Sequence, residues 1–328
     1  MPLTARAVRV SQDDWHCAAL CNIFAPSFYS RIIGGLEQLV WTEAIQNFYS
    51  QREVNLKGNP YFEELFSDDV RSTIIDSIGS FFGERLRSDF DIAAHKMISG
   101  DFIDVHTDSN DHNETHRMTV TLNDGWSLSD GGILLALNSG AISSVRDAWL
   151  PTANNGFVFK ISESSYHAVT PILGSRPRYS LIITFKRSGV SCTKEPTWIP
   201  FVLQSDVECA TATAAHMGIS PETFTAPFKY SEFGTVDDLR SFVSGHLYNA
   251  PKQWSYKKGT SINVDHNGNQ PKGTDADRVD AVRKLRRIPP IIVVRRKTGC
   301  YCLVDGSHRL SHAHDESLSI GVALYEEK

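Results

Sequence analysis

Two histidines and an aspartate in the first half of the chain have the types and the spacing of a metal site. His106 and Asp108 are separated by one residue in the segment 100–108, which we predict to be extended. Successive side chains of a strand point to opposite faces, so these two project to the same face, about 6–7 Å apart along the chain. A third ligand has to come from another strand, and His167 is a candidate. Such a set would leave about three coordination positions of a cation open.

Two histidines and one carboxylate form the facial triad of non-haem Fe(II) oxygenases, whose open positions admit a keto acid and O2. Arg178 follows His167 by eleven residues, and Ser180 faces the same side of the strand that Arg178 begins. The guanidinium offers a fork for a carboxylate. Alone, a His-x-Asp tripeptide is weak in a chain with 12 histidines, and a lone arginine is typical of an exposed strand end. The combination predicts a metal site beside a carboxylate site.

Several short blocks, in this order, resemble the 2-oxoglutarate/Fe(II)-dependent dioxygenase superfamily, closest to its prolyl-hydroxylase-like branch. The resemblance covers roughly residues 90–187. Its blocks are Gly100-Asp101-Phe102 before His106-Thr107-Asp108, Gly131-Gly132-Ile133-Leu134, Asn155 to Phe159, His167 with Val169 and Pro171, and Arg178 with Ser180. The resemblance implies a double-stranded β-helix, or jelly roll, that binds Fe(II) through His106, Asp108 and His167. It also implies that Arg178 and Ser180 hold the distal carboxylate of 2-oxoglutarate.

The same resemblance implies a reaction. With O2 as co-substrate, 2-oxoglutarate would yield succinate and CO2 while an unactivated C–H of an amino acid, a peptide or a small natural product is hydroxylated. Halogenases of the superfamily carry a small residue in place of the carboxylate ligand, so an intact Asp108 favours hydroxylation or desaturation. Members often carry a tyrosine where this chain has Met97, so the residue that contacts the other carboxylate of 2-oxoglutarate stays unassigned.

A second motif lies near the C-terminus, in the residues Asp305, Gly306, Ser307, His308 and Arg309. Free backbone N–H groups at a helix start, together with a guanidinium, suit an anion. The segment 280–328 resembles the ParB/sulfiredoxin-like fold, which implies a loop that handles phosphate or nucleotide. The alternative interpretation is a helix start in which Arg309 pairs with Asp305.

The periodicity of the chain predicts an α+β fold with two domains and a connector. Apolar spacings of three to four residues predict helices near 33–50 and 68–87, and short β-branched runs predict strands at 118–122, 132–137, 156–159 and 179–185. Together with the resemblance described above, this pattern leads us to expect a dioxygenase domain at 1–190. Prolines and small residues indicate a linker at 191–227. A smaller α/β domain is expected at 228–328, with strands at 288–294, 301–304 and 318–325.

Composition excludes several classes of protein. With 33 basic and 38 acidic side chains the formal charge is −5, and the acidic excess lies in the first half, which offers no basic groove for nucleic acid. No apolar run is long enough to span a membrane, and six sparse cysteines do not form a disulfide framework, so we expect a cytoplasmic protein. Besides the oxygenase, two alternatives stay open: a protein directed at nucleic acid or nucleotide, and a bifunctional enzyme whose C-terminal half transfers phosphoryl groups. The sequence leaves the oligomeric state open.

Overall fold

The computed structural model describes residues 4–11, 15–109, 114–188, 198, 201–225, 227, 229–244, 247–250, 275–285 and 287–328. The chain divides into two compact units, Met1–Thr193 (unit 1) and Lys194–Lys328 (unit 2). Among the described residues, no helix is long and apolar enough to cross a bilayer.

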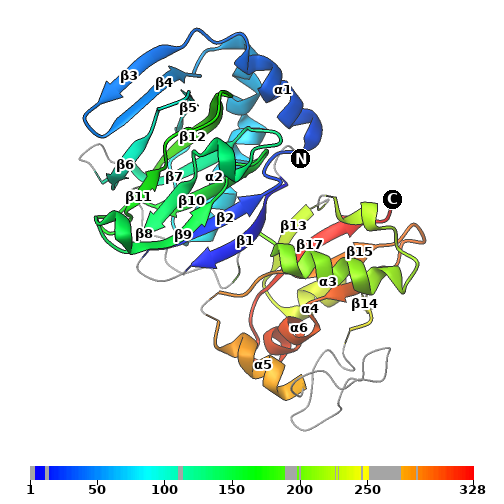
Figure 1. The fold of residues 1–328 in the computed structure, drawn as a ribbon. Helices are drawn as coiled ribbons and strands as arrows, with labels where there is room; N and C mark the ends of the chain where they lie inside the picture. Colours follow the sequence, from blue (N-terminus) through cyan, green and yellow to red (C-terminus); the bar gives the residue numbers. More distant parts are fainter. Residues whose placement is uncertain are drawn as a thin grey trace. The chain divides into compact units, whose positions relative to one another are not determined.

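Unit 1 is built around one large curled antiparallel sheet (Figure 1). Within the described residues it has 12 strands in the order β1-β2-β10-β7-β12-β5-β4-β6-β11-β8-β9, and β3 pairs with β4. Their bounds are β1 Arg6–Ser11, β2 Cys17–Cys21, β3 Thr42–Gln46, β4 Tyr49–Asn55, β5 Asp91–Met97, β6 Ile103–His106, β7 Glu114–Thr121, β8 Leu134–Leu137, β9 Val145–Trp149, β10 Asn155–Lys160, β11 His167–Val169 and β12 Arg178–Lys186. The curled sheet is consistent with the expected jelly roll, and all four predicted strands of this half are present.

The helices of unit 1 agree with the predictions in one case and differ in the other. Helix α2 (Asp68–Phe82) forms where the spacing predicts it and ends at Gly83, whose φ of +69° is left-handed. The prediction of a helix near 33–50 is wrong for most of that segment. Helix α1 spans Pro26–Leu36, and β3 and β4 follow as a hairpin. Short 3₁₀ helices lie at Pro60–Phe66, Leu128–Asp130 and Ile142–Ser144.

The physical reason for this difference is strand pairing. One edge of β4 pairs with β3 and the other with β5, so residues 49–55 are committed to the sheet. Leu36 and Leu39 are buried, but the apolar residues that follow do not continue a buried stripe: Val40 is 88% exposed and Ile45 is 62% exposed. Their three-to-four spacing therefore marks no core-facing helix surface.

Unit 2 is a five-stranded sheet between helices, in the strand order β13-β17-β15-β16-β14. Its elements are α3 Gln204–Ala215, a 3₁₀ turn Pro221–Phe224, β13 Lys229–Phe233, α4 Val236–Phe242, β14 Leu247–Tyr248, α5 Asp275–Arg283, β15 Ile291–Arg295, β16 Tyr301–Asp305, α6 Ser307–Asp315 and β17 Ile320–Glu326. Ile291 and Val293 of β15 pack with the cluster that includes α4 and α6, whereas Ile292 and Val294 pack with α3. Burial on both faces explains the continuous apolar run that predicts this strand.

The expected linker at 191–227 is wrong in its second half. Helix α3 belongs to the core of unit 2, because Val207, Ala210 and Ala214 are buried against β15, β16 and β17. The small residues that suggested a connector are the side chains that allow this helix to lie close to the sheet. The first part of the expected linker, residues 191–197 with 199 and 200, lies outside the described residues.

Candidate metal centre and co-substrate pocket

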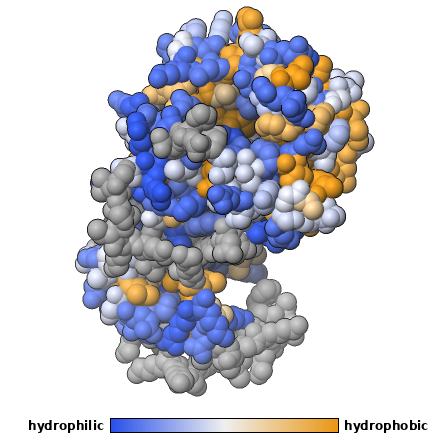
Figure 2. Space-filling model, turned by 90° about the vertical axis from the view of Figure 1, so that its left-hand side faces the viewer, coloured by the Kyte–Doolittle hydropathy of each residue, from blue (hydrophilic) through white to orange (hydrophobic). Residues whose placement is uncertain are grey.

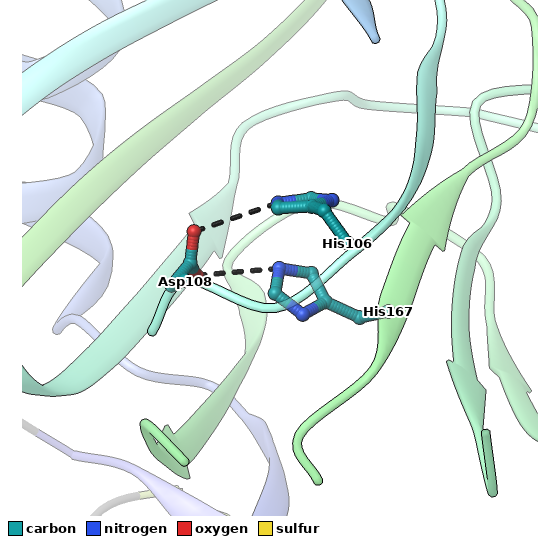
Figure 3. A group of neighbouring side chains, drawn as sticks. All are labelled: His106, Asp108 and His167. Carbon is teal, nitrogen blue, oxygen red and sulfur yellow. Dashed lines mark ion pairs between the residues drawn. The ribbon is translucent and has the colours of Figure 1, made fainter. Parts of the chain in front are cut away.

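His106, Asp108 and His167 converge in unit 1, although His167 lies 61 residues beyond His106 in the chain. One ligand atom from each lies within 4.8 Å of the other two. Asp108 Oδ1 is 3.4 Å from His106 Nε2, and Asp108 Oδ2 is 3.3 Å from His167 Nε2 (Figure 3). Two imidazole nitrogens and a carboxylate oxygen at these separations form a donor set that fits a divalent transition-metal ion.

Two neighbouring strands position the histidines. His106 ends β6 and His167 begins β11, and the antiparallel pairing sets the two residues directly opposite each other. Each Nδ1 lies within hydrogen-bond distance of a backbone carbonyl, His106 with Asp104 O at 2.8 Å and His167 with Ser165 O at 2.9 Å. Because a carbonyl only accepts, each Nδ1 carries the proton, and both Nε2 atoms offer a lone pair to a cation.

The Gly100-Asp101 block holds the turn before β6. The carboxylate of Asp101, which is buried, accepts hydrogen bonds from Ser50 Oγ at 2.7 Å, Arg52 Nη1 at 3.0 Å and the backbone N–H of Ile98 at 2.8 Å. Gly100 adopts a φ of +88°, which favours glycine. The block therefore fixes β6 against β4 and sets the position of His106, without itself reaching a ligand.

Asp108 is a buried carboxylate among cationic and polar neighbours. Burial opposes its ionisation, but the pKa of Asp108 lies well below its usual range, and the Arg117 guanidinium is a neighbour that favours the anion. Arg117 Nη1 donates to Asp108 Oδ1. Asp108 Oδ2 is buried and has no hydrogen-bond partner among the described residues. Burying a carboxylate oxygen without a hydrogen-bond donor destabilises the folded protein. A cation bound to Oδ2 would offset this loss.

Arg178 is a buried cation at the start of β12. Its Nε donates to Gly132 O at 3.1 Å, and its Nη1 lies 3.4 Å from Ser180 Oγ and 3.7 Å from Met97 Sδ. Within the described residues it forms no ion pair. Burial lowers the pKa of Arg178 to about 10, so the guanidinium is still charged at neutral pH. Burying a charge without an ion-pair partner is strongly unfavourable, so an anion bound beside Arg178 would be stabilised.

The triad and Arg178 line one cavity of about 510 Å³. Its wall includes four alternate positions on one face of β12: Arg178, Ser180, Ile182 and Thr184. Gln51, Glu53, His95, Arg117 and Thr119 also line the cavity. Burial, with Arg117 and Arg178 nearby, lowers the pKa of His95 to about 3, so this imidazole is neutral at pH 7. A cavity of about 510 Å³ is large enough for a small dicarboxylate and part of a second molecule.

The β3–β4 hairpin borders this cavity. Phe48 and Tyr49 lie at its turn, and the Phe48 ring is 5.4 Å from the His106 ring. Hydrophobic residues occur as separate patches between hydrophilic ones on the face of unit 1 that Figure 2 shows. Phe48, at 41% exposure, belongs both to the surface and to the cavity wall, so the turn of the hairpin forms part of the rim of the cavity.

Sequence reasoning missed Arg117, Glu114 and the cavity residues of β4. A signal for Arg117 was present, because alternation along residues 114–121 places Arg117 on the same face as Thr119 and Thr121. Gln51 carried no such signal, since the segment around it suggests a helix.

The five residues of the C-terminal motif lie together in unit 2. Asp305, Gly306, Ser307, His308 and Arg309 border a pocket of about 650 Å³ at the start of α6. Arg309 pairs with both Asp305 and Asp206. A Cβ on Gly306 would lie 2.7 Å from Ile291 Cγ2, and its φ is +95°. The pair between Arg309 and Asp305 is the one that the helix-start interpretation expects, and two carboxylates already offset the charge of Arg309. A phosphate or nucleotide site here stays a prediction.

Residues 92–186 match the family model described as "2OG-Fe(II) oxygenase superfamily". The matched segment contains His106, Asp108, His167, Arg178 and Ser180. The matched segment covers less than a third of the chain and is similar to that superfamily, which uses Fe(II) and 2-oxoglutarate with O2. It does not reach residues 280–328, so the ParB/sulfiredoxin-like resemblance stays a prediction.

Among solved structures, the chain is similar to a prolyl-4-hydroxylase from Pseudomonas putida, with 21% identity over 53% of this chain and 93% of that one and a TM-score of 0.42. It is also similar to a prolyl hydroxylase from Trichoplax adhaerens in complex with a peptide fragment of hypoxia inducible factor, with 14% identity, coverage of 52% and 83% and a TM-score of 0.42. HygX from Streptomyces hygroscopicus, with nickel and 2-oxoglutarate bound, shows 11% identity, coverage of 54% and 85% and a TM-score of 0.39. No curated protein matches the chain.

Proposed function

We propose that unit 1 is a 2-oxoglutarate-dependent hydroxylase that binds Fe(II) through His106, Asp108 and His167. Its substrate is an amino acid, a peptide or a small natural product with an unactivated C–H bond. One oxygen atom of O2 enters the new hydroxyl group and the other enters succinate, while 2-oxoglutarate loses CO2. The reaction is therefore balanced without any further reductant.

The observation that carries this proposal is the convergence of the three ligand atoms within 4.8 Å. The bound iron would supply the activation of O2. Two histidines and one carboxylate oxygen leave about three of six octahedral positions for the co-substrates. Hydrogen bonds from both Nδ1 atoms to backbone carbonyls keep the two Nε2 lone pairs directed at the ion.

Arg178 and Ser180 supply the second part of the proposal. The guanidinium, buried without an ion-pair partner in the described residues, binds the distal carboxylate of 2-oxoglutarate, and the Ser180 hydroxyl donates to the same group. Gly132 O fixes the orientation of the guanidinium by accepting from its Nε. The keto acid is thereby oriented with its other end toward the triad, and its own volume excludes water from the pocket.

The test is the formation of succinate from 2-oxoglutarate by the full-length protein with Fe(II) and O2, measured with and without candidate substrates. Loss of one of the three protein ligands prevents the site from holding the metal ion. We therefore expect His167→Ala to reduce succinate formation by a factor on the order of 100 or more. The control is His216→Ala, which lies in unit 2 at the end of α3. Turnover by His167→Ala at the wild-type rate would rule out the proposed metal centre.

A further inference from the structure

The two oxygens of Asp108 have different surroundings. Oδ1 accepts a hydrogen bond from Arg117 Nη1 and lies 3.4 Å from His106 Nε2. Oδ2 is buried, has no hydrogen-bond donor among the described residues and lies 3.3 Å from His167 Nε2. A carboxylate oxygen that already accepts a charge-assisted hydrogen bond is a poorer metal ligand than one whose lone pairs are free. The surroundings therefore select Oδ2.

Arg117 is itself held in place. Its Nη2 donates to Glu114 Oε2 at 2.7 Å, so the guanidinium bridges two carboxylates. Arg117 lies within β7, which pairs with β10 on one side and β12 on the other, and it stands opposite Phe159 and Thr184 in the two ladders. Its backbone is thus fixed by hydrogen bonds on both edges. A planar guanidinium on such a backbone holds a carboxylate in one orientation.

We propose that Arg117 is a positioning residue that restricts Asp108 to coordinating the metal through one oxygen. This inference rests on the proposed metal centre and adds the residue that sets the number of open positions. Two histidines and one oxygen leave about three positions of an octahedral ion, enough for a chelating keto acid and O2. If both oxygens of Asp108 bound the ion, about two would be left, and O2 would have no site once the keto acid was bound.

The experiment uses Mn(II) alone as the probe of the full-length protein. The proton relaxation rate of water reports how many exchangeable water molecules the bound ion carries. We expect about three in the wild type and about two in Arg117→Met, a fall of roughly one third in the relaxivity of the bound ion. Arg117→Lys keeps a cationic donor and should restore the wild-type value. Arg187→Gln removes an exposed arginine that lies 3.6 Å from Glu84 and should leave the value unchanged.

The outcomes separate this inference from the function on which it rests. Mn(II) bound with equal relaxivity by wild type and Arg117→Met would overturn the role of Arg117 and leave the metal centre intact. A folded wild type that binds no Mn(II) would overturn both. If Arg117→Met does not fold, Glu114→Gln gives the same test, because it weakens the anchor of the guanidinium. A relaxivity of Glu114→Gln below the wild-type value supports the proposal, and an equal value contradicts it.

Discussion

At the scale of single residues, unit 1 concentrates charge where a ligand would neutralise it. Arg178 is buried without a carboxylate partner in the described residues, and Asp108 has one oxygen without a donor. Arrangements of this kind cost stability unless something binds. By contrast, Arg309 in unit 2 lies between two carboxylates and has no such deficit. This difference supports the proposal that Arg178 binds an anion, whereas Arg309 belongs to an internal ion-pair network.

The first prediction concerns Arg178. Replacing it with glutamine removes a charged hydrogen-bond donor of the kind that contributes about 1.5–3 kcal/mol. The concentration of 2-oxoglutarate that gives half-maximal succinate formation should therefore rise about 10- to 100-fold. The matched control is Arg176→Gln, two residues away, because Arg176 bonds Asp130 and the carbonyls of Asp124 and Gly125 at the surface. An unchanged response of Arg178→Gln to 2-oxoglutarate would remove the proposed role.

At the scale of elements, glycines and strand pairing decide where the site residues point. Gly132 precedes β8 with a φ of +65°, and a Cβ there would lie 2.8 Å from Arg178 Cδ and 2.6 Å from Ile172 Cδ1. The Arg178 and Ile172 side chains therefore explain the glycine at position 132, whereas a Cβ on Gly131 would lie 2.1 Å from Pro171 O.

The second prediction is that Gly132→Ala weakens the binding of 2-oxoglutarate. The added methyl group must displace Arg178 or Ile172, and the left-handed backbone adds about 1–2 kcal/mol. Titration of the Fe(II)-loaded protein with 2-oxoglutarate under anaerobic conditions measures this effect. Gly125→Ala is the control, because Gly125 has a φ of +58° and open space around its Cβ position. If both substitutions weakened the binding of 2-oxoglutarate equally, the cause would be backbone strain and not the contact with Arg178.

The third prediction concerns the packing of α2 on β7, where the His116 ring lies 4.4 Å from that of Phe82. Burial, with Lys160, Arg187 and His16 nearby, lowers the pKa of His116 to about 3. The unfolded chain takes up this proton near pH 6.5, whereas the folded chain does not, so stability is present above pH 6.5 and is lost as the pH falls. At pH 5 the loss from this residue is about 2 kcal/mol.

Denaturant unfolding of the wild type and of His116→Gln at pH 7.5 and pH 5 measures this contribution. The loss of stability between the two pH values should be about 2 kcal/mol smaller in the variant, which has no imidazole to protonate at this position. Equal losses in the two proteins would mean that His116 does not titrate in this way.

At the scale of the whole molecule, each unit has its own hydrophobic core. The clusters around β15 lie entirely in unit 2, and those around Phe157 and Met97 lie entirely in unit 1. All the residues of the proposed metal centre come from unit 1. A change that weakens unit 2 should therefore leave the metal chemistry intact.

The fourth prediction tests this independence with Arg309→Met. The substitution leaves Asp206 and Asp305 without their shared cation. Removing one partner of a buried ion pair lowers the free energy of unfolding by about 3–5 kcal/mol, and we expect a loss of this order for unit 2. Calorimetry should show a lower unfolding temperature for unit 2 only, and the turnover of 2-oxoglutarate should equal that of the wild type. Loss of turnover in a folded Arg309→Met protein would show that the two units are coupled.

The sequence by itself determined the candidate ligands, the extended segment that carries His106 and Asp108, and most of the strands of both halves. Period-two alternation and the order of short motifs are local properties, so they can be read without coordinates. Tertiary structure alone decided the remainder. Pairing of β3 with β4, and of β4 with β5, commits residues 42–55 to the sheet. Burial against β15 makes α3 part of a core, and a contact between β7 and the residues after β6 brings Arg117 to Asp108. Each of these depends on contacts between residues distant in the chain, and such contacts leave no periodic signal in any one segment.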